Sequence, residues 1–220
     1  MEAGYRSGWQ VLCNSFWAVL AATAWNTMYV PGSVHALLTG EGLGGEKPYD
    51  GDGWCAVEGG WSRGLVFAAL GHFACCLGDT LASELGVLSK EEPRLVTTFR
   101  KVPRGTNGGI SGFGTTYSML GGAVIGLAMG VCVAVENQAC GRGVIAGMVG
   151  CGAFAGGFGS LVDSVLGATM QETRYSAERK MITDGSSGQP INGWNVLTNN
   201  QVNLVSSFIT AALLGWMMSL

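Results

Sequence analysis

The sequence predicts an all-α, polytopic helical membrane protein with about five transmembrane helices in a single integral membrane domain, 1–220. Glycine accounts for 37 of the 220 residues, hydrophobic residues for 48% of the chain, and charged residues for only 12%. Glycine is therefore more than twice as frequent, and charge about half as frequent, as in an average soluble protein. A soluble domain could not build its charged surface from this composition, whereas membrane helices pack closely through small residues.

The same composition excludes two other classes of protein. Disordered chains are poor in apolar residues and rich in charge, which is the opposite of what is found here. The formal net charge of −3 argues against a nucleic-acid partner, since nucleic-acid binders are basic. The expected partner is the lipid bilayer, and the oligomeric state is left open.

Gaps between charged residues place the spans at about 11–30, 64–88, 110–135, 143–169 and 202–220. Each span is long enough to cross the hydrocarbon core, which requires about 20 helical residues, although Asp79 and Glu84 stand near the far end of 64–88. Pro31 and Gly32 end the first span. This span is the weakest of the five because Asn14 and Asn26 interrupt its apolar character.

The basic residues predict how the chain is oriented. With five spans, the N-terminus and the loops 89–109 and 170–201 share one face, which carries nine Lys and Arg residues against three on the other. The positive-inside rule assigns the basic face to the cytoplasm, or to the stroma of a plastid. The organelle is left open between the endoplasmic reticulum and a chloroplast membrane. Cys55 and Cys140 fall together on the opposite face, where an oxidising lumen would allow them to pair.

Three acidic residues lie inside the predicted spans. Asp79 and Glu84 belong to the segment GDTLASELG, and Asp163 is alone in the otherwise uncharged span 143–169. Intramembrane carboxylates are expensive, which makes function the default hypothesis. The alternative interpretation is structural: Asp79 and Glu84 cap the end of a span, and Asp163 pairs with a donor on a neighbouring helix.

Two further motifs carry polar groups that suit phosphates. The loop LSKEEPRLVTTFRKVPRGTNGG combines clustered cations with a glycine-rich turn before a helix, both of which bind anions. Its candidate phosphate-binding residues are Lys90, Arg94, Arg100, Lys101, Arg104, Gly105, Thr106, Asn107, Gly108 and Gly109. In NNQVNLVSS, the amides of Asn200 and Asn203 are candidates for binding a metal or a ribose. The alternatives are a basic loop that touches anionic lipid and amides that link helices.

The predicted topology brings all of these motifs to the basic membrane boundary. Carboxylates surrounded by phosphate-binding cations favour a Mg²⁺ ion that bridges to a nucleotide. The sequence therefore predicts Mg²⁺ as cofactor, with Asp79, Glu84 and Asp163 as its catalytic ligands. A second, lipidic substrate would enter sideways from the bilayer.

The motifs GDTLASELG, LSKEEPRLVTTFRKVPRGTNGG, GSLVDSVLGATMQ and NNQVNLVSS, in this order, resemble those of the transmembrane protein 19 family. That family includes the chloroplast phytyl-phosphate kinase of tocopherol biosynthesis. The resemblance covers most of residues 9–219 and implies a nucleotide-dependent kinase, with CTP preferred, acting on a prenyl monophosphate. Leu81 departs from the Trp that family members usually carry after Gly-Asp-Thr. Since family members begin with further hydrophobic helices, this chain is expected to lack N-terminal helices.

Two other functions fit a glycine-rich helical membrane protein. One is a small-solute or ion transporter, and the other is a non-catalytic multi-pass membrane protein. A transporter places its polar groups near the bilayer midplane. Here the polar motifs lie near one face, which favours the lipid kinase.

Overall fold

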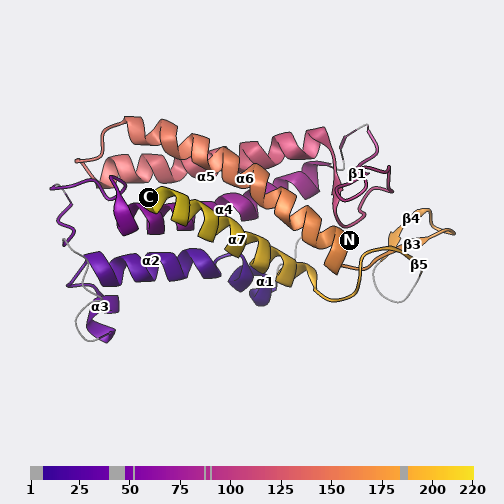
Figure 1. Ribbon diagram of the computed structural model, residues 1–220, viewed down its shortest axis with the longest axis horizontal. Helices are drawn as coiled ribbons and strands as arrows, with labels where there is room; N and C mark the ends of the chain where they lie inside the picture. The colour runs from indigo at the N-terminus through magenta and orange to yellow at the C-terminus, as the bar shows by residue number, and fades with distance from the viewer. Residues whose placement is uncertain (1–6, 40–47, 52, 87, 90, 184–187) are drawn as a thin grey trace.

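The computed structural model describes residues 7–39, 48–51, 53–86, 88–89, 91–183 and 188–220. Within these ranges, four helices are long and apolar enough to cross a membrane, which confirms the all-α membrane fold. They are α4 (Gly60–Gly86), α5 (Gly112–Glu136), α6 (Gly143–Met170) and α7 (Asn199–Ser219). Figure 1 shows them running side by side as one elongated bundle.

The segment predicted as the first span is not one continuous helix. It is divided into α1 (Gly8–Cys13) and α2 (Phe16–Tyr29), and the 14 residues of α2 are too few to count among the candidate spans. At about 1.5 Å per residue, α2 is shorter than the hydrocarbon core. The break is at Asn14, whose backbone N–H caps α1 by donating to the Gln10 and Leu12 carbonyls. Asn and Ser compete with the helical backbone for hydrogen bonds and favour such ends.

The loops contain short strands that the sequence did not predict. In the loop after α4, β1 (Arg94–Leu95) pairs antiparallel with β2 (Gly109–Ile110). In the loop after α6, β3 (Thr173–Ser176), β4 (Met181–Thr183) and β5 (Gln189–Asn192) form an antiparallel sheet in the order β4-β3-β5. Both sheets lie at the same end of the bundle (Figure 1). A further short helix, α3 (Val34–Leu38), follows α2.

Glycine sets the spacing of the helices. A Cβ atom on Gly122 of α5 would collide with the backbone of Gly152, and one on Gly156 of α6 would collide with the carbonyl of Ser118. Gly78 of α4 lies against both α5 and α6, since Ser118 O and Gly156 Cα are both within 3 Å of its ideal Cβ position. Backbones of α4, α5 and α6 therefore approach one another closely, as small-residue packing in membranes allows. This confirms that these glycines are packing residues.

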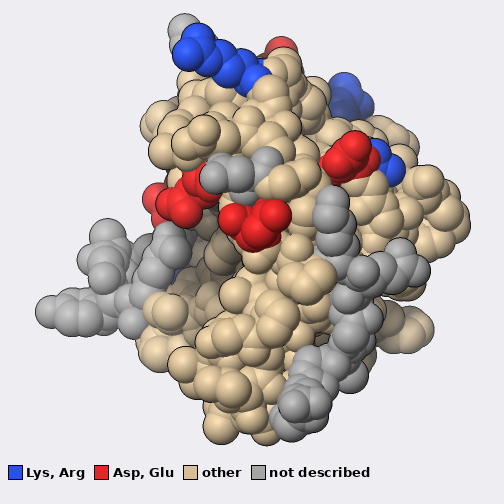
Figure 2. All heavy atoms as spheres, turned by 90° about the vertical axis from the view of Figure 1, so that its left-hand side faces the viewer, with Lys and Arg blue, Asp and Glu red and all other residues tan. Residues whose placement is uncertain are grey.

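The two ends of the bundle differ in charge and in covalent structure. The sheet-bearing end carries the described cations of both long loops, whereas Arg63 and Arg142 lie at the other end. Figure 2 views that other end and shows acidic side chains across its middle and basic ones towards its top. There, Cys55 and Cys140 form a disulfide with a Cα–Cα distance of 4.7 Å, which confirms that the two cysteines lie together. A disulfide is typical of an oxidising compartment.

Labelling of single cysteines tests the orientation. Arg100→Cys and Arg179→Cys lie on exposed loops of the sheet-bearing end, and Arg142→Cys lies at the disulfide end. We expect a membrane-impermeant maleimide to label the first two only from the cytoplasmic or stromal side, and the third only from the opposite side, because cations are retained inside. The unsubstituted chain is the control for background labelling. The reverse pattern would contradict the orientation.

Candidate functional site

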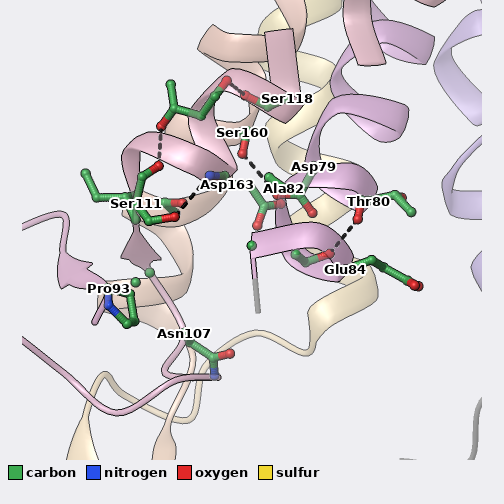
Figure 3. A pocket seen from close by; sticks show the side chains of 18 of the residues that line it. Asp79, Thr80, Ala82, Glu84, Pro93, Asn107, Ser111, Ser118, Ser160 and Asp163 are labelled. Atoms are coloured by element: carbon green, nitrogen blue, oxygen red, sulfur yellow. Dashed lines mark hydrogen bonds between the residues drawn. The ribbon is translucent and has the colours of Figure 1, made fainter. Parts of the chain in front are cut away.

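A cavity of about 310 Å³ lies at the sheet-bearing end of the bundle, and all four sequence motifs contribute to its walls. The loop 104–111 borders it on one side, and residues of α4, α5, α6 and α7 line the rest. Figure 3 shows Pro93 and Asn107 on the side of the loops, with Ser118 and Ser160 further into the bundle. The sequence predicted that the four motifs converge, and in the structure residues from all four line this cavity.

Asp79 of α4 and Asp163 of α6 are half-buried and both line this cavity. The Ser160 hydroxyl donates to Asp79 Oδ1 at 3.5 Å, a long and weak bond. The Ser206 hydroxyl of α7 donates to Asp163 Oδ2 at 2.9 Å. Two ionised carboxylates that line one cavity repel each other. A cation between them would offset that repulsion.

Asn203 of α7 is the second donor to Asp163. In the amide orientation that pairs donors with acceptors, its nitrogen donates to Asp163 Oδ2 at 3.1 Å and to the Asn199 carbonyl at 3.2 Å. Ser206 also donates to the Asn203 carbonyl at 3.2 Å. One oxygen of Asp163 is thus fixed by two donors from α7. Asn203, predicted to bind substrate, contacts a carboxylate in this structure.

Glu84 does not join the two aspartates. It lines the outer part of the cavity, but its side chain is exposed and is directed away from Asp79 and Asp163 (Figure 3). No cluster of three His, Cys, Asp or Glu residues that could hold a metal occurs within the described ranges. Of the three carboxylates predicted to bind a metal, Asp79 and Asp163 thus lie together, and Glu84 lies apart from them. The reason is helical: five residues on a helix turn the side chain by about 140°.

The loop 105–109 is fastened to the end of α6. Gly105 and Gly108 have φ values of +85° and +77°, which glycine adopts without strain. The Asn107 backbone N–H donates to Thr173 Oγ1 at 3.2 Å, and its side-chain amide donates to the Glu172 carbonyl at 3.4 Å. Thr106 donates to the Pro103 carbonyl at 2.7 Å. Thr106 and Asn107 thus use these donors to hold the loop, although both residues line the cavity.

The predicted phosphate-binding cations are separated by the structure. Arg104 lines the cavity and donates to the Ser89 carbonyl at 2.5 Å. Arg94, Arg100 and Lys101 are exposed on the β1 turn and do not line it; Lys101 pairs with Glu92 at 3.2 Å. Lys90 lies outside the described residues, and Asn200 does not line the cavity. Among the described cations of this loop, Arg104 therefore lines the cavity, and Arg94, Arg100 and Lys101 lie on a separate exposed surface.

The structure also adds wall residues that the sequence did not single out. They are Gln10 and Asn14, which come from α1 and its C-terminal cap. Asn199, the first residue of the motif NNQVNLVSS, also lines the cavity, one turn of α7 before Asn203. Asn14 stood out in the sequence only as a weakness of the first span. Ser206, the donor to Asp163, follows Asn203 by three residues, a spacing that brings two side chains to one helix face.

Comparison with known proteins identifies the family. Residues 1–211 match the family described as integral membrane protein DUF92. The chain belongs to this family. It is 34% identical to Protein PGR of Arabidopsis thaliana over 223 aligned residues, which are 96% of this chain and 69% of PGR. No solved structure matches the chain.

Microbial relatives share a shorter part of the chain. The uncharacterized membrane protein MJ0933 of Methanocaldococcus jannaschii is 34% identical over 66% of this chain, and the uncharacterized membrane protein sll0875 of Synechocystis is 30% identical over 70%. The matched parts are 50% and 48% of those two proteins. These relatives support a membrane protein and assign no activity.

Two glycine substitutions test how the loop is docked. A Cβ on Gly108 would collide with Ala168 and the Ser164 carbonyl, whereas one on Gly105 makes ordinary contacts with Ile182, the nearest at 3.6 Å. Both have positive φ, so Gly105→Ala is a matched control for backbone strain. We expect Gly108→Ala to release the loop and speed amide hydrogen exchange at residues 104–110 by more than Gly105→Ala, because overpacking adds about 1–3 kcal/mol. Equal exchange in the two variants would contradict the docking.

Proposed function

We propose that this protein is a membrane-embedded, nucleotide-dependent kinase of a prenyl monophosphate, with CTP as the preferred donor, similar to phytyl-phosphate kinase. The observation that carries the proposal is the pair Asp79 and Asp163, half-buried on two helices and facing one cavity beside Arg104 and the glycine-rich loop. The resemblance of the four motifs to the transmembrane protein 19 family supports the choice of substrates.

The two carboxylates suit a Mg²⁺ ion. Mg²⁺ in phosphoryl-transfer sites is bound by one or two carboxylates, with water and substrate phosphates completing its shell. Asp163 Oδ2 is occupied by Ser206 and Asn203, which holds the carboxylate in one orientation. Ser160 contacts Asp79 Oδ1 in the same way, though more weakly. When bound, the cation would neutralise charge on the transferred phosphoryl group.

The reaction is a transfer of the terminal phosphoryl group of the nucleotide. The bond from the γ-phosphorus to its bridging oxygen breaks, a bond to a phosphate oxygen of the prenyl monophosphate forms, and a nucleoside diphosphate leaves. Such transfers depend on positioning and charge stabilisation and need no covalent intermediate. Asp79 and Asp163 would fix the metal-bound phosphates, and Arg104 at the cavity wall would bind phosphate from the aqueous side.

The position of the cavity favours this function over a small-solute or ion transporter. Transporters built from broken helices place their sites near the bilayer midplane. Here the cavity is lined by the connecting loop 104–111 and by the adjoining parts of α4, α5, α6 and α7, so it lies towards one end of the bundle. A prenyl phosphate would carry its charged group at such an end. If the experiment below finds no phosphoryl transfer, the alternative of a non-catalytic membrane protein is favoured.

Removing one carboxylate charge tests the proposal. In the chain purified and reconstituted in lipid nanodiscs, Asp79→Asn and Asp163→Asn are each expected to lower kcat by about 10²-fold or more, because loss of one electrostatic contact in the transition state has that effect. The measurement is transfer of γ-³²P from CTP to phytyl phosphate.

Glu136→Gln is the matched control for the loss of one acidic charge. Glu136 is exposed at the opposite end of the bundle, so this variant is expected to keep the wild-type rate. Near-normal turnover in both Asn variants would contradict the metal site. Absence of transfer in the wild-type chain, with several nucleotides and prenyl phosphates tried, would contradict the kinase.

A further inference from the structure

The exposed side chains that line the cavity differ in chemistry from one side to another. On α6, the exposed lining side chain is apolar: Leu161 lines the cavity and is 40% exposed. The other exposed side chains among the described lining residues are all polar, and they are Ser83, Glu84, Glu91, Arg104 and Asn199. The cavity therefore reaches the surface at a polar edge and, separately, at an apolar position on α6.

Leu161 belongs to the outer face of α6. Phe154, seven residues earlier, and Val165, four residues later, share this helix face; they are 47% and 44% exposed and do not line the cavity. At about 1.5 Å per residue, Leu161 is about 14 Å from the end of α6 at Met170. The 28 residues of α6 exceed the hydrocarbon core by about 12 Å in all. Leu161 therefore lies at the depth of the lipid chains.

The contact between α5 and α6 changes at this level. Further from the cavity the two helices are in backbone contact, as Gly122 and Gly152 show. Gly157 lines the cavity, and its neighbour is a side chain: Met119 Cγ and Sδ lie 2.9 and 3.8 Å from the ideal Cβ position of Gly157. In the described part of the protein, no other atom outside α6 is within 4 Å of that position. Met119 is itself 46% exposed, so one flexible side chain covers this part of the wall.

The chemistry of Met119, Gly157 and Leu161 selects the part of a substrate that fits beside them. None of these side chains offers a strong hydrogen-bond partner. A nucleotide placed here would leave its sugar and base groups unpaired, which is unfavourable. A hydrocarbon chain has no such groups, and it is favoured in contact with Met, Leu and the lipid beyond them.

We propose that the cavity opens sideways to the bilayer between α5 and α6, at Met119, Gly157 and Leu161, and that the chain of the prenyl phosphate extends through this side opening. The inference rests on the proposed kinase function and adds the path of the lipid substrate. The phosphate reaches Asp79 and Asp163 from the membrane, while the nucleotide enters at the polar edge. Met119 can move aside because methionine side chains are flexible.

Photolabelling locates the lipid chain directly. The probe is phytyl phosphate that carries a diazirine at the middle of its chain, added with Mg²⁺ to the full chain in nanodiscs. Irradiation is expected to label Met119 and Leu161, as identified by mass spectrometry of the peptides. An excess of unlabelled phytyl phosphate should remove this labelling, because a site saturates whereas the bilayer does not. Labelling that is spread over the lipid-facing helices and is not competed would mean that ordinary bilayer lipid covers this face, which would overturn the side opening.

Leu161→Trp and Phe154→Trp are a matched pair of variants. Both residues lie on the outer face of α6, but only Leu161 lines the cavity. Leu161→Trp is expected to abolish the competed labelling of Met119 and to raise the KM for phytyl phosphate about tenfold, because a larger side chain overpacks the side opening. The kcat value and the KM for CTP should not change. Phe154→Trp should behave as the wild type, and equal melting temperatures would show that both variants are folded. Met119→Trp blocks the side opening from α5 and serves as a second blocking variant.

The outcomes distinguish the side opening from the function. If the wild type transfers phosphate but the competed labelling falls on other helices, or both blocking variants keep the wild-type KM for phytyl phosphate, the side opening is wrong and the kinase stands. If the wild type transfers none, the kinase is wrong, and the labelling alone decides. Competed labelling of Met119 and Leu161 that is lost in Leu161→Trp and kept in Phe154→Trp then supports the side opening, whereas its absence, or its survival in Leu161→Trp, overturns it.

Discussion

The structure depends on keeping two carboxylates, Asp79 and Asp163, inside a bundle of membrane helices. An acidic side chain in this environment is unfavourable unless it is paired, hydrogen-bonded or bound to a cation. Ser160 and Ser206 supply hydroxyl donors from two helices. These contacts require helices close enough for short side chains to meet. Glycine provides that closeness: a Cβ on Gly159 of α6 would collide with Cys75 of α4.

This constraint accounts for the difference between the two ends of the bundle. At the disulfide end, Asn137 donates to the Tyr49 hydroxyl at 2.7 Å and to the Trp54 carbonyl at 3.1 Å. Tyr49 and Trp54 pack as an edge-to-face pair, and Cys55–Cys140 adds a covalent link. That end is tightly joined. The opposite end keeps a cavity, which is lined mainly by polar and small residues.

Much of the fold follows from charge gaps and composition. The span predicted at 110–135 is the helix Gly112–Glu136, and that predicted at 143–169 is the helix Gly143–Met170. Long apolar segments must be helical in a membrane because every backbone group has to be paired internally. This reasoning does not hold for the first predicted span. Asn14 is the C-cap residue of α1, so the helix ends there although the surrounding residues are apolar. Hydropathy averages over a window and does not register a single cap.

The site could be predicted less completely, for a physical reason. Topology tells which membrane face a motif reaches, and that argument placed Asp79, Asp163 and the loop 105–109 at one boundary. It does not tell where a side chain points. Glu84 is separated from Asp79 by the turn of the helix, and the β1 pairing carries Lys101 away from the cavity. The donors Ser160 and Ser206 are ordinary packing residues in the sequence and acquire a role only through contacts between helices.

Direct measurement of metal binding tests the central claim, that Asp79 and Asp163 together hold a divalent cation with the nucleotide. Mn²⁺ can stand in for Mg²⁺ and is observed by electron paramagnetic resonance in the reconstituted chain with a non-hydrolysable CTP analogue. We predict one tightly bound Mn²⁺ per chain, lost in both Asp79→Asn and Asp163→Asn and retained in Glu136→Gln. No bound Mn²⁺ in the wild type, or undiminished binding in the two Asn variants, would contradict the account.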